Sequence, residues 1–173
     1  IQRLDRHFYT TSSCGVCGKT SIDAVKMAGT CNVVKSPSRA LDVDIIYTLS
    51  DTLRQAQDTF ALTGGLHAAA LFDFSGRLLA VREDVGRHNA LDKLIGHYTF
   101  NNVIPLNDSI LLLSGRASFE LLQKAAMAGI AVVCAVGAPS SLAVATADAF
   151  GITLIGFLRE KRFNLYTRHA DLQ

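Results

Sequence analysis

What the sequence lacks narrows its function first. No apolar run approaches the roughly 18 residues that a membrane-spanning helix requires, and no signal peptide is recognisable at its start. The formal net charge is only +2, which gives no electrostatic argument for nucleic acid or an anionic membrane surface as a partner. Internal repeats and low-complexity tracts are absent too. We therefore expect a cytoplasmic protein that binds neither nucleic acid nor membranes.

The length of 173 residues suits one domain, and 49% hydrophobic residues are enough for a real core. The first residue is Ile1 rather than methionine, so we expect an N-terminal portion to be missing from the chain. A polar region over residues 1–40 ends at "SPSRA", where Pro37 indicates a turn. The expected organisation is this polar N-terminal region, followed by an α/β domain over residues 41–173.

Cysteine is scarce, and the four thiols are not equivalent. Cys134 lies within the apolar run "IAVVCAVGA" and is expected to be a buried small hydrophobic residue, and Cys31 shows no sign of special chemistry. Cys14 and Cys17 form a CxxC pair in "SSCGVCG", a polar segment punctuated by glycine. Because no export signal is visible, we expect this pair to be reactive thiols rather than part of a disulfide framework.

A CxxC pair serves several chemistries. A structural zinc site would need two further ligands, and neither a second CxxC nor a spaced histidine pair follows. A thiol-disulfide oxidoreductase would place the pair after a strand, at the start of a helix, and no convincing strand precedes it. A sulfur-carrying nucleophile needs a thiolate, because the thiolate is the species that attacks a sulfane sulfur. The residues alone leave all three open.

The rest of the chain predicts alternating strands and helices. Residues 43–65 have helical spacing and stop at a glycine pair, and "LHAAALFD" and "RLLAVRED" predict a hairpin joined by "FSG". A helix is predicted over "GRHNALDKLIGHYTF". Three buried-strand candidates follow it, "SILLLSGR", "IAVVCAVGA" and "ITLIGFLRE", and they alternate with two helix-like segments that each end in glycine. This order predicts an α/β fold with a mixed, largely parallel sheet covered on both faces.

The order of elements resembles the cytidine deaminase fold, whose enzymes hold a catalytic zinc. Those enzymes place His-x-Glu at the start of the first helix after the hairpin, and Pro-Cys-x-x-Cys at the start of the next. Here the first helix opens with His88, but Ala90 stands where the glutamate would be, and the next helix opens with "SGRASFE", without cysteine. We therefore predict a deaminase-like three-layer fold without the zinc site.

Three polar, glycine-bearing turns follow predicted strands: "REDVGRHN" (82–89), "SGRAS" (114–118) and "GAPSS" (137–141). Ligands of α/β sheets bind at this edge, where small residues expose backbone N–H groups and helix N-termini favour anions. Arg87 and Arg116 would add bidentate contacts, while Asp84, Asn89 and the serines would supply selectivity. Ordinary helix caps also use Ser and Asp, but three such turns exceed what capping requires.

Several segments together are similar to the FdhD family, the sulfurtransferases needed to make formate dehydrogenase. They are "SSCGVCG", "GGLHAAALFD", "REDVGRHNALDKLIG", "LSGRASFELLQKAAMAGI" and "GAPSSLAVATADAFGITLIGFLRE". The similarity extends from about Thr11 to Tyr166, and "REDVGRHNALDK" is long enough to be specific.

The resemblance implies a mechanism that the thiols can support. A cysteine desulfurase hands sulfur to the CxxC loop as a persulfide, and the protein passes it to molybdenum (or tungsten) in the bis-guanine-dinucleotide form of the pterin cofactor (molybdopterin guanine dinucleotide). The cofactor is then inserted into formate dehydrogenase. By resemblance, Cys14 bears the persulfide and Cys17 helps it. The family also implies a homodimer, and no metal-ligating residues are expected.

The cofactor is large and anionic, which matches the polar strand-end edge. The resemblance also implies that "FLREKR", at the end of the last predicted strand, contacts the cofactor, although a charged strand edge would look the same. His67 either faces the same pocket or is an ordinary core residue. The expected cofactor-binding residues are Asp84, Arg87, His88, Asn89, Ser114, Gly115, Arg116, Ala138, Pro139, Ser140, Phe157, Leu158, Arg159, Glu160, Lys161, Arg162 and His67.

Overall fold

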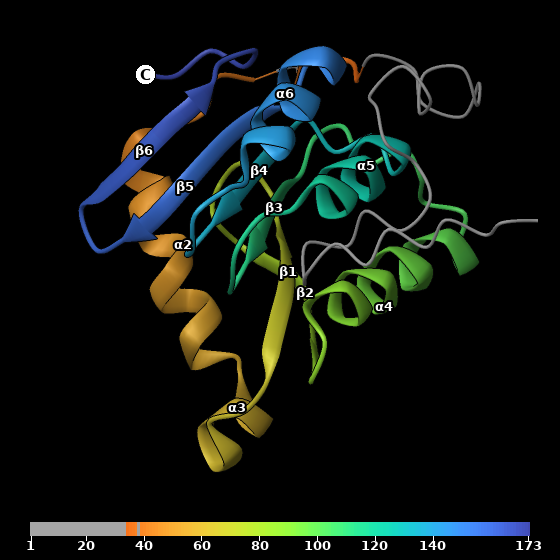
Figure 1. The fold of residues 1–173 in the computed structure, drawn as a ribbon, viewed down its shortest axis with the longest axis vertical. Helices are drawn as coiled ribbons and strands as arrows, with labels where there is room; N and C mark the ends of the chain where they lie inside the picture. The colour runs from red at the N-terminus through yellow and green to blue at the C-terminus, as the bar shows by residue number, and fades with distance from the viewer. Residues whose placement is uncertain (1–33, 38) are drawn as a thin grey trace, which may run out of the picture.

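The computed structural model describes residues 34–37 and 39–173. In this part of the chain, helices alternate with strands around a single sheet (Figure 1). The helices are α2 (Val43–Gln55), α3 (Asp58–Thr63), α4 (Arg87–Phe100), α5 (Phe119–Met127) and α6 (Ser141–Phe150). The strands are β1 (His67–Phe72), β2 (Leu78–Asp84), β3 (Ile110–Leu113), β4 (Val132–Ala135), β5 (Thr153–Arg159) and β6 (Arg162–Thr167).

The sheet has the order β2-β1-β3-β4-β5-β6 and is mixed. Its centre is parallel, because β4 pairs in parallel with both β3 and β5, and α5 and α6 are the crossover helices. The other three pairs are antiparallel: β1 with β2, β1 with β3, and β5 with β6. The mixed α/β fold is thus confirmed, and its parallel part is confined to three strands.

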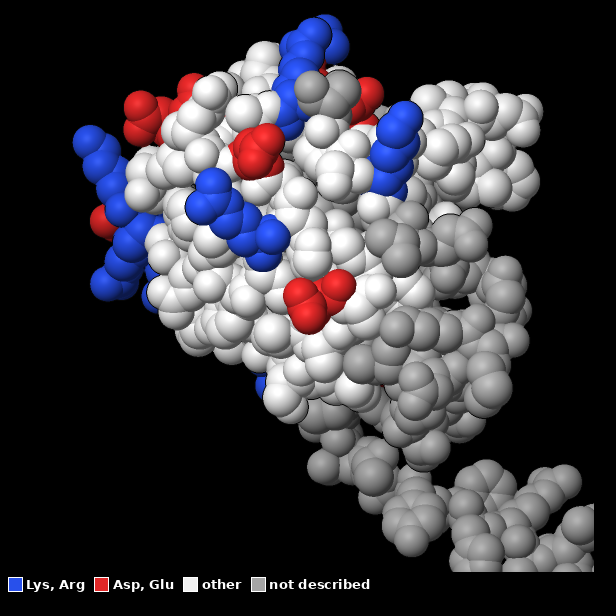
Figure 2. Space-filling model, turned by 90° about the horizontal axis from the view of Figure 1, so that it is seen from above, with Lys and Arg blue, Asp and Glu red and all other residues white. Residues whose placement is uncertain are grey.

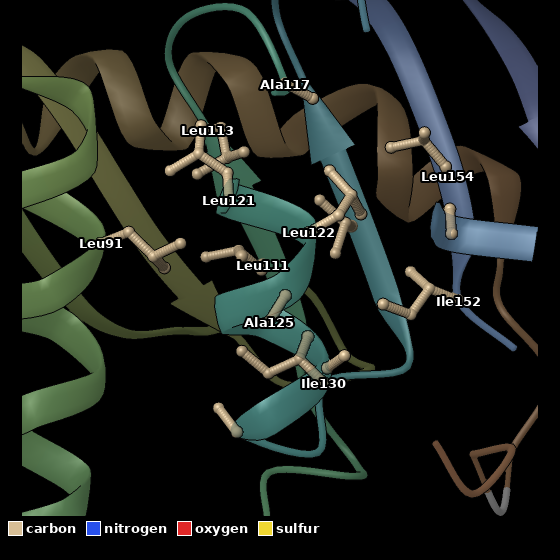
Figure 3. Packing of buried hydrophobic residues seen from close by; sticks show 14 of the residues in the cluster. Leu91, Leu111, Leu113, Ala117, Leu121, Leu122, Ala125, Ile130, Ile152 and Leu154 are labelled. Carbon is tan, nitrogen blue, oxygen red and sulfur yellow. The ribbon is translucent and has the colours of Figure 1, made fainter. Parts of the chain in front are cut away.

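Helices cover both faces of the sheet, which makes three layers (Figure 1). One core lies between the sheet and α4, α5 and α6, and the second lies between the sheet and α2. Leu111 and Leu112 show the alternation, since these neighbours on β3 belong to the two different cores and both are fully buried. Figure 3 shows the first core, in which Leu121, Leu122 and Ala125 of α5 pack among side chains of the sheet and of α4.

The predicted helix over residues 43–65 is wrong in one respect, because it is interrupted. Helix α2 ends at Gln55, and Gln57 has the non-helical backbone angles φ −93° and ψ 73°. A new helix, α3, then starts at Asp58, and the carboxylate of Glu83 on β2 accepts hydrogen bonds from the N–H groups of Thr59 and Phe60 at 3.0 and 2.8 Å. The predicted end is confirmed, since Gly64 closes α3 with φ +67°.

The prediction that "FLREKR" ends the last strand is also wrong. These residues form the end of β5, a tight turn and the first residue of β6, which is an edge strand of the sheet. Arg162 and Asn164 interrupt the apolar residues of β6, and only Thr167 is buried, so β6 lacks the continuous apolar run of the central strands. Thr167 anchors its far end: the hydroxyl donates to the carbonyl of Ile152 at 2.6 Å and accepts from the N–H of Leu154 at 3.0 Å.

Charge is distributed without strong separation on the face seen from above in Figure 2. Acidic and basic groups are interspersed there, apart from a gathering of Lys and Arg at the left margin, the side on which Figure 1 places β5 and β6. Within the described residues, no helix is both long and apolar enough to cross a membrane.

Candidate functional site

The turns that follow β3 and β4 lie against each other at one edge of the sheet, and the end of β5 joins them. Backbone hydrogen bonds connect them directly: the N–H of Gly137 donates to the carbonyl of Gly115 at 3.0 Å, and the N–H of Ser140 donates to the carbonyl of Ala117 at 3.0 Å. The N–H of Phe157 donates in turn to the carbonyl of Gly137 at 3.2 Å. Two of the three predicted turns are thus brought together with the "FLREKR" segment.

Gly137 is required by this contact. A Cβ atom at this position would lie 2.9 Å from the backbone nitrogen of Arg116 and 3.0 Å from the carbonyl carbon of Gly115. Both neighbours are backbone atoms, which cannot move aside as a flexible side chain can. The glycine in "GAPSS" therefore serves close backbone packing at the candidate site.

The turn between β2 and α4 is held by its own polar residues. The carboxylate of Asp84 accepts hydrogen bonds from the N–H of Gly86 at 2.9 Å and from the amide of Asn89 at 3.1 Å, and it pairs with the ammonium of Lys93. The hydrogen bond from Lys93, followed by those from Gly86 and Asn89, lowers the pKa of Asp84 to about 2. The structure therefore uses Asp84 and Asn89 to shape the turn that presents Arg87 and His88.

His88 connects the beginnings of α4 and α5. Its Nε2 lies 3.1 Å from the hydroxyl of Ser118 and 3.7 Å from the carboxylate of Glu120. Burial, followed by the positive charge of Arg87, lowers the pKa of His88, while Glu120 acts in the opposite direction. The imidazole is therefore neutral near pH 7, where one ring nitrogen can donate a hydrogen bond and the other can accept one.

Glu120 is a site residue that the sequence reasoning missed. Both of its carboxylate oxygens are buried and have no hydrogen-bond partner within the described part of the chain, and the same holds for Nε of Arg87. The signal was present in "SGRASFE", where the glutamate follows the predicted turn by two residues. The sequence does not single it out, because acidic residues are favoured in the first turn of any helix.

A large cavity opens at the same edge of the sheet, on the side of α2. Its volume is about 840 Å³. From the predicted set, it is lined by His67, Ser114, Leu158, Arg159 and Glu160. The lining also includes residues of α2, of α3 and of the break between them that were not predicted: Ser50, Asp51, Leu53, Arg54, Gln57 and Phe60.

The sequence did not predict these lining residues, because this wall of the cavity is formed at the break between α2 and α3. Gln57 sits at the break and is 5% exposed, and its Nε2 has no hydrogen-bond partner among the described residues. A buried amide left without a partner costs about 1–3 kcal/mol, so such groups are uncommon in folded proteins. Its presence in the wall of the cavity suits a group that pairs with a ligand.

The predicted residues do not all meet in this cavity. Neither Arg116 nor the 138–140 segment is among the described residues that line it, and Arg87, His88 and Asn89 are outside it as well. The edge of the sheet therefore carries two polar regions, one around the cavity and one around His88 and the turn of Arg116.

The β5–β6 turn borders more than one hollow. Phe157, Arg159 and Arg162 line a second cavity of about 400 Å³, and Glu160 and Lys161 line another of about 400 Å³ against α2. Phe157 and Glu160 have φ angles of +55° and +48°, which non-glycine residues rarely adopt. Such backbone strain is concentrated at functional sites.

The thiols fall into two groups. Cys134 is buried, as predicted, and burial raises the pKa of its thiol to about 12, which makes it unreactive. Cys14 and Cys17, together with Cys31, lie outside the described residues. Within the described residues, no group of three or more His, Cys, Asp or Glu side chains is arranged to hold a metal ion.

Comparison with known families gives a direct result, because the model of the FdhD/NarQ family matches residues 2–173. The chain belongs to the FdhD/NarQ family. The resemblance seen in the sequence is thereby confirmed. This assignment covers the CxxC segment as well as the α/β domain.

Curated members of the FdhD/NarQ family are close in sequence. The chain is 59% identical over 165 residues to the sulfur carrier protein FdhD of Mycobacterium tuberculosis, covering 95% of this chain and 59% of that protein. It is 55% identical over 163 residues to the protein of the same name from Streptomyces avermitilis, covering 94% of this chain and 58% of the relative. The chain thus spans less than two thirds of the length of these relatives.

A solved structure has the same fold. It is a crystal structure from Desulfotalea psychrophila, assigned as a formate dehydrogenase accessory protein, and it superposes with a TM-score of 0.70 at 29% sequence identity. The superposition covers 77% of this chain and 56% of that chain.

Proposed function

We propose that this FdhD/NarQ chain carries sulfur as a cysteine persulfide and delivers it to the molybdenum or tungsten of a bis-guanine-dinucleotide pterin cofactor destined for formate dehydrogenase. The observation that carries the proposal is the 59% identity, over 95% of the chain, to proteins named sulfur carrier. Residues 1–40 would supply the thiols, and residues 41–173 would bind the cofactor. The partners would be a cysteine desulfurase, formate dehydrogenase and a second copy of the chain, in the cytoplasm.

The loading step needs no redox cofactor. The thiolate of Cys14 attacks the terminal sulfur of the desulfurase persulfide, and the sulfur–sulfur bond of the donor breaks. The donor cysteine leaves as a thiolate, and Cys14 becomes a persulfide, so electrons and atoms balance. In the delivery step, the thiolate of Cys17 attacks the inner sulfur of that persulfide. Sulfide is released to the metal of the cofactor, and a Cys14–Cys17 disulfide remains, which a cellular dithiol then reduces.

The described residues support the binding half of the proposal. A bis-dinucleotide carries two diphosphates, and Arg116, Arg159 and Arg162 at the strand-end edge can form charge-assisted hydrogen bonds with them. Helix α5 has no side-chain cap at its N-terminus, so its first N–H groups can donate hydrogen bonds to an anion. His88, Ser118 and the segment 138–140 complete the polar surface beside these groups.

The sulfur-carrying half is tested by mass spectrometry. After incubation with a cysteine desulfurase and cysteine, we expect one additional sulfur atom on the peptide that contains Cys14. Cys14→Ala should abolish this addition, whereas Cys17→Ala should keep it but fail to deliver sulfur to the cofactor. Cys31→Ala is the matched control and should behave as the wild type. If Cys14→Ala still gains sulfur on Cys17 and supports formate dehydrogenase activity, the assigned roles are wrong.

The binding half is tested with GDP as a fragment of the cofactor. Removing the guanidinium in Arg116→Ala should weaken GDP binding about tenfold or more, because a charge-assisted contact is lost. The same variant should still acquire a persulfide on Cys14, since the two tasks use different residues. Arg168→Ala removes an equal charge from an exposed residue beyond β6 and should bind GDP normally. Loss of both activities in a folded Arg116→Ala protein would contradict the division of labour.

A further inference from the structure

The beginnings of α4 and α5 bring together an imidazole, a hydroxyl and a carboxylate on one face of the sheet (Figure 1). Nε2 of His88 lies 3.1 Å from the hydroxyl of Ser118 and 3.7 Å from the carboxylate of Glu120. Both carboxylate oxygens of Glu120 are buried, and neither has a hydrogen-bond partner among the described residues. Burying a carboxylate without hydrogen bonds destabilises a fold, so this glutamate indicates a role in chemistry.

The contacts of the imidazole assign different roles to its two nitrogens. Nε2 faces the hydroxyl and the carboxylate, and a neighbouring carboxylate favours a proton on the nitrogen that it faces. Nδ1 is then the unprotonated nitrogen, and no hydrogen bond joins it to another residue that the structure describes. The side chain of His88 is 32% exposed, so an incoming group can reach it. An imidazole oriented by a carboxylate through its far nitrogen is the arrangement of a general base.

The charges around His88 keep the imidazole neutral and ready to accept a proton. Burial is the largest cause that lowers its pKa, followed by the guanidinium of Arg87. Glu120 acts in the opposite direction. Lys124 lowers the pKa and Asp92 raises it, and these two groups pair with each other at 2.6 Å. These are the charged groups of α4 and α5 that act on the ring.

The same surroundings favour a thiolate over a thiol. Neither α4 nor α5 has a side-chain cap at its N-terminus, and the guanidinium of Arg87 adds a positive charge. Helix N-termini and cationic side chains lower the pKa of a cysteine. Cys134 cannot be this cysteine, because it is buried and the pKa of its thiol is raised to about 12.

The remaining thiols belong to residues 1–33, which join the described structure at Val34. This valine packs in the core that α4 and α5 cover, and its N–H donates to the carbonyl of Phe150 at 2.8 Å. An extended chain spans about 3.3–3.6 Å per residue, so residues 18–33 can cover about 50 Å. Helix α5 is only about 14 Å long. Cys17 is therefore within reach of His88, on the same face of the sheet.

We infer that His88 is the general base that takes the proton of Cys17 when sulfur is delivered, and that Glu120 positions its imidazole. The inference rests on the proposed function and adds the group that generates the attacking thiolate. The carboxylate of Glu120 stabilises the imidazolium that exists between the two proton transfers of the step.

The step is balanced without a further reactant. Nδ1 of His88 accepts the proton of the Cys17 thiol, and the resulting thiolate attacks the inner sulfur of the Cys14 persulfide anion. The sulfur–sulfur bond breaks, and the outer sulfur leaves with the bonding electron pair. It takes the proton from the imidazolium and departs as hydrosulfide. The two cysteines are oxidised to a disulfide, the transferred sulfur is reduced, and His88 is neutral again.

The first test measures the rate at which Cys17 of the full chain reacts with iodoacetamide over a range of pH, with fragmentation mass spectrometry assigning the label. In the wild type, the apparent pKa should lie below the ordinary thiol value of about 8.5. His88→Gln should raise it by about one pH unit or more, and Glu120→Gln should raise it by less. His97→Gln removes an exposed imidazole from the last turn of α4 and should leave the profile unchanged.

The second test follows delivery in a single turnover. The chain is loaded by a cysteine desulfurase and separated from it, and hydrosulfide and the Cys14–Cys17 disulfide are then measured over time. His88→Gln should slow both about 100-fold, the usual size of a general-base contribution. Glu120→Gln should slow both about tenfold. The sulfur on Cys14 is measured at the start, so that a loading defect is not mistaken for slow delivery.

A structural role gives a different result. Glu120→Gln should keep or raise the midpoint of thermal unfolding, because a neutral amide replaces a buried charge without hydrogen bonds. Wild-type pH profiles in both His88→Gln and Glu120→Gln would refute the assignment, whatever their effect on GDP binding, and the sulfur-carrier proposal would stand. If the wild-type chain acquires no sulfur while the Cys17 profile still depends on His88, the proposed function fails and the pairing of these two residues stands.

Discussion

Asp73 organises the tight turn between β1 and β2 through one side chain. Its carboxylate accepts hydrogen bonds from the hydroxyl of Ser75 at 2.6 Å, from the N–H of Ser75 at 2.9 Å and from the N–H of Arg77 at 3.1 Å. It also forms an ion pair with the guanidinium of Arg77 at 3.0 Å. The hydrogen bond from the Ser75 hydroxyl is the largest cause that lowers the pKa of Asp73, from 3.8 to about 2.

This lowered pKa predicts a dependence of stability on pH. A carboxylate whose pKa is lower in the folded state stabilises the fold at pH values above its unfolded pKa of 3.8, and this contribution is lost as the pH falls toward about 2. In Asp73→Asn, we expect a weaker dependence of the free energy of unfolding on pH between about pH 5 and pH 2. Urea unfolding at a series of pH values measures it, with Asp58→Asn as the exposed control. Identical pH profiles for Asp73→Asn and the wild type would contradict the role of this turn.

At the scale of elements, the strand-end turns depend on the close approach of two backbones. Gly137→Ala would place a Cβ within 3.0 Å of backbone atoms of Gly115 and Arg116. We expect a loss of about 1–3 kcal/mol in the free energy of unfolding, because a packed contact is forced apart. GDP binding should weaken in the same variant, since the turn of Arg116 is displaced. Urea unfolding and GDP titration measure the two effects.

Gly96 provides the matched control for this change. It lies within α4, and a Cβ there would meet no atom within 4 Å. Gly96→Ala should therefore stabilise the protein by up to about 1 kcal/mol, through helix propensity, without altering GDP binding. If both alanine variants behave alike, the contact between the two turns is not what requires glycine at position 137.

The sequence predicted those elements whose pattern is local. The β1–β2 hairpin, the buried central strands and the glycines that end α3, α5 and α6 all follow from short runs and turn residues. The break at Gln57 was not predictable, because the apolar spacing of α2 continues across it and the contact that fixes α3 comes from Glu83, more than 20 residues later. Strand β6 was missed because it lacks the continuous apolar run of the central strands.

The same distinction applies to the candidate site. The glycine-bearing turns were visible because their composition differs from that of the flanking strands, and the structure brings the turns after β3 and β4 together with the end of β5. Asp51 and Gln57 were not visible, since each looks like an ordinary polar residue of an amphipathic helix. Only the tertiary arrangement of α2, α3 and the β5–β6 turn places them around one cavity.

At the scale of the whole molecule, one sheet carries two cores. Leu111 faces the core under α4, α5 and α6, and Leu112 faces the core under α2. Because both side chains belong to the same central strand, we expect the two layers to unfold together. Leu111→Ala and Leu112→Ala should each lower the free energy of unfolding by about 2–5 kcal/mol while keeping a single transition.

Far-UV circular dichroism and tyrosine fluorescence during urea unfolding measure this cooperativity, since the chain contains four tyrosines and no tryptophan. Leu62→Ala is the control, because this leucine is 88% exposed and its truncation should change stability by less than about 0.5 kcal/mol. Two separate transitions in either core variant would show that the layers are independent.

The burial of Cys134 has a practical consequence for counting sulfur. Alkylating reagents consume thiolates, and a thiol with a pKa of about 12 at the centre of the sheet supplies almost none in the native protein. Any alkylated or sulfur-loaded cysteine found in the folded chain must therefore be one of the other three. Once the chain is denatured, Cys134 becomes available to the reagent. Labelling of Cys134 under native conditions would therefore identify molecules that were unfolded when the reagent was added. Its labelling after denaturation serves as an internal standard for complete reaction.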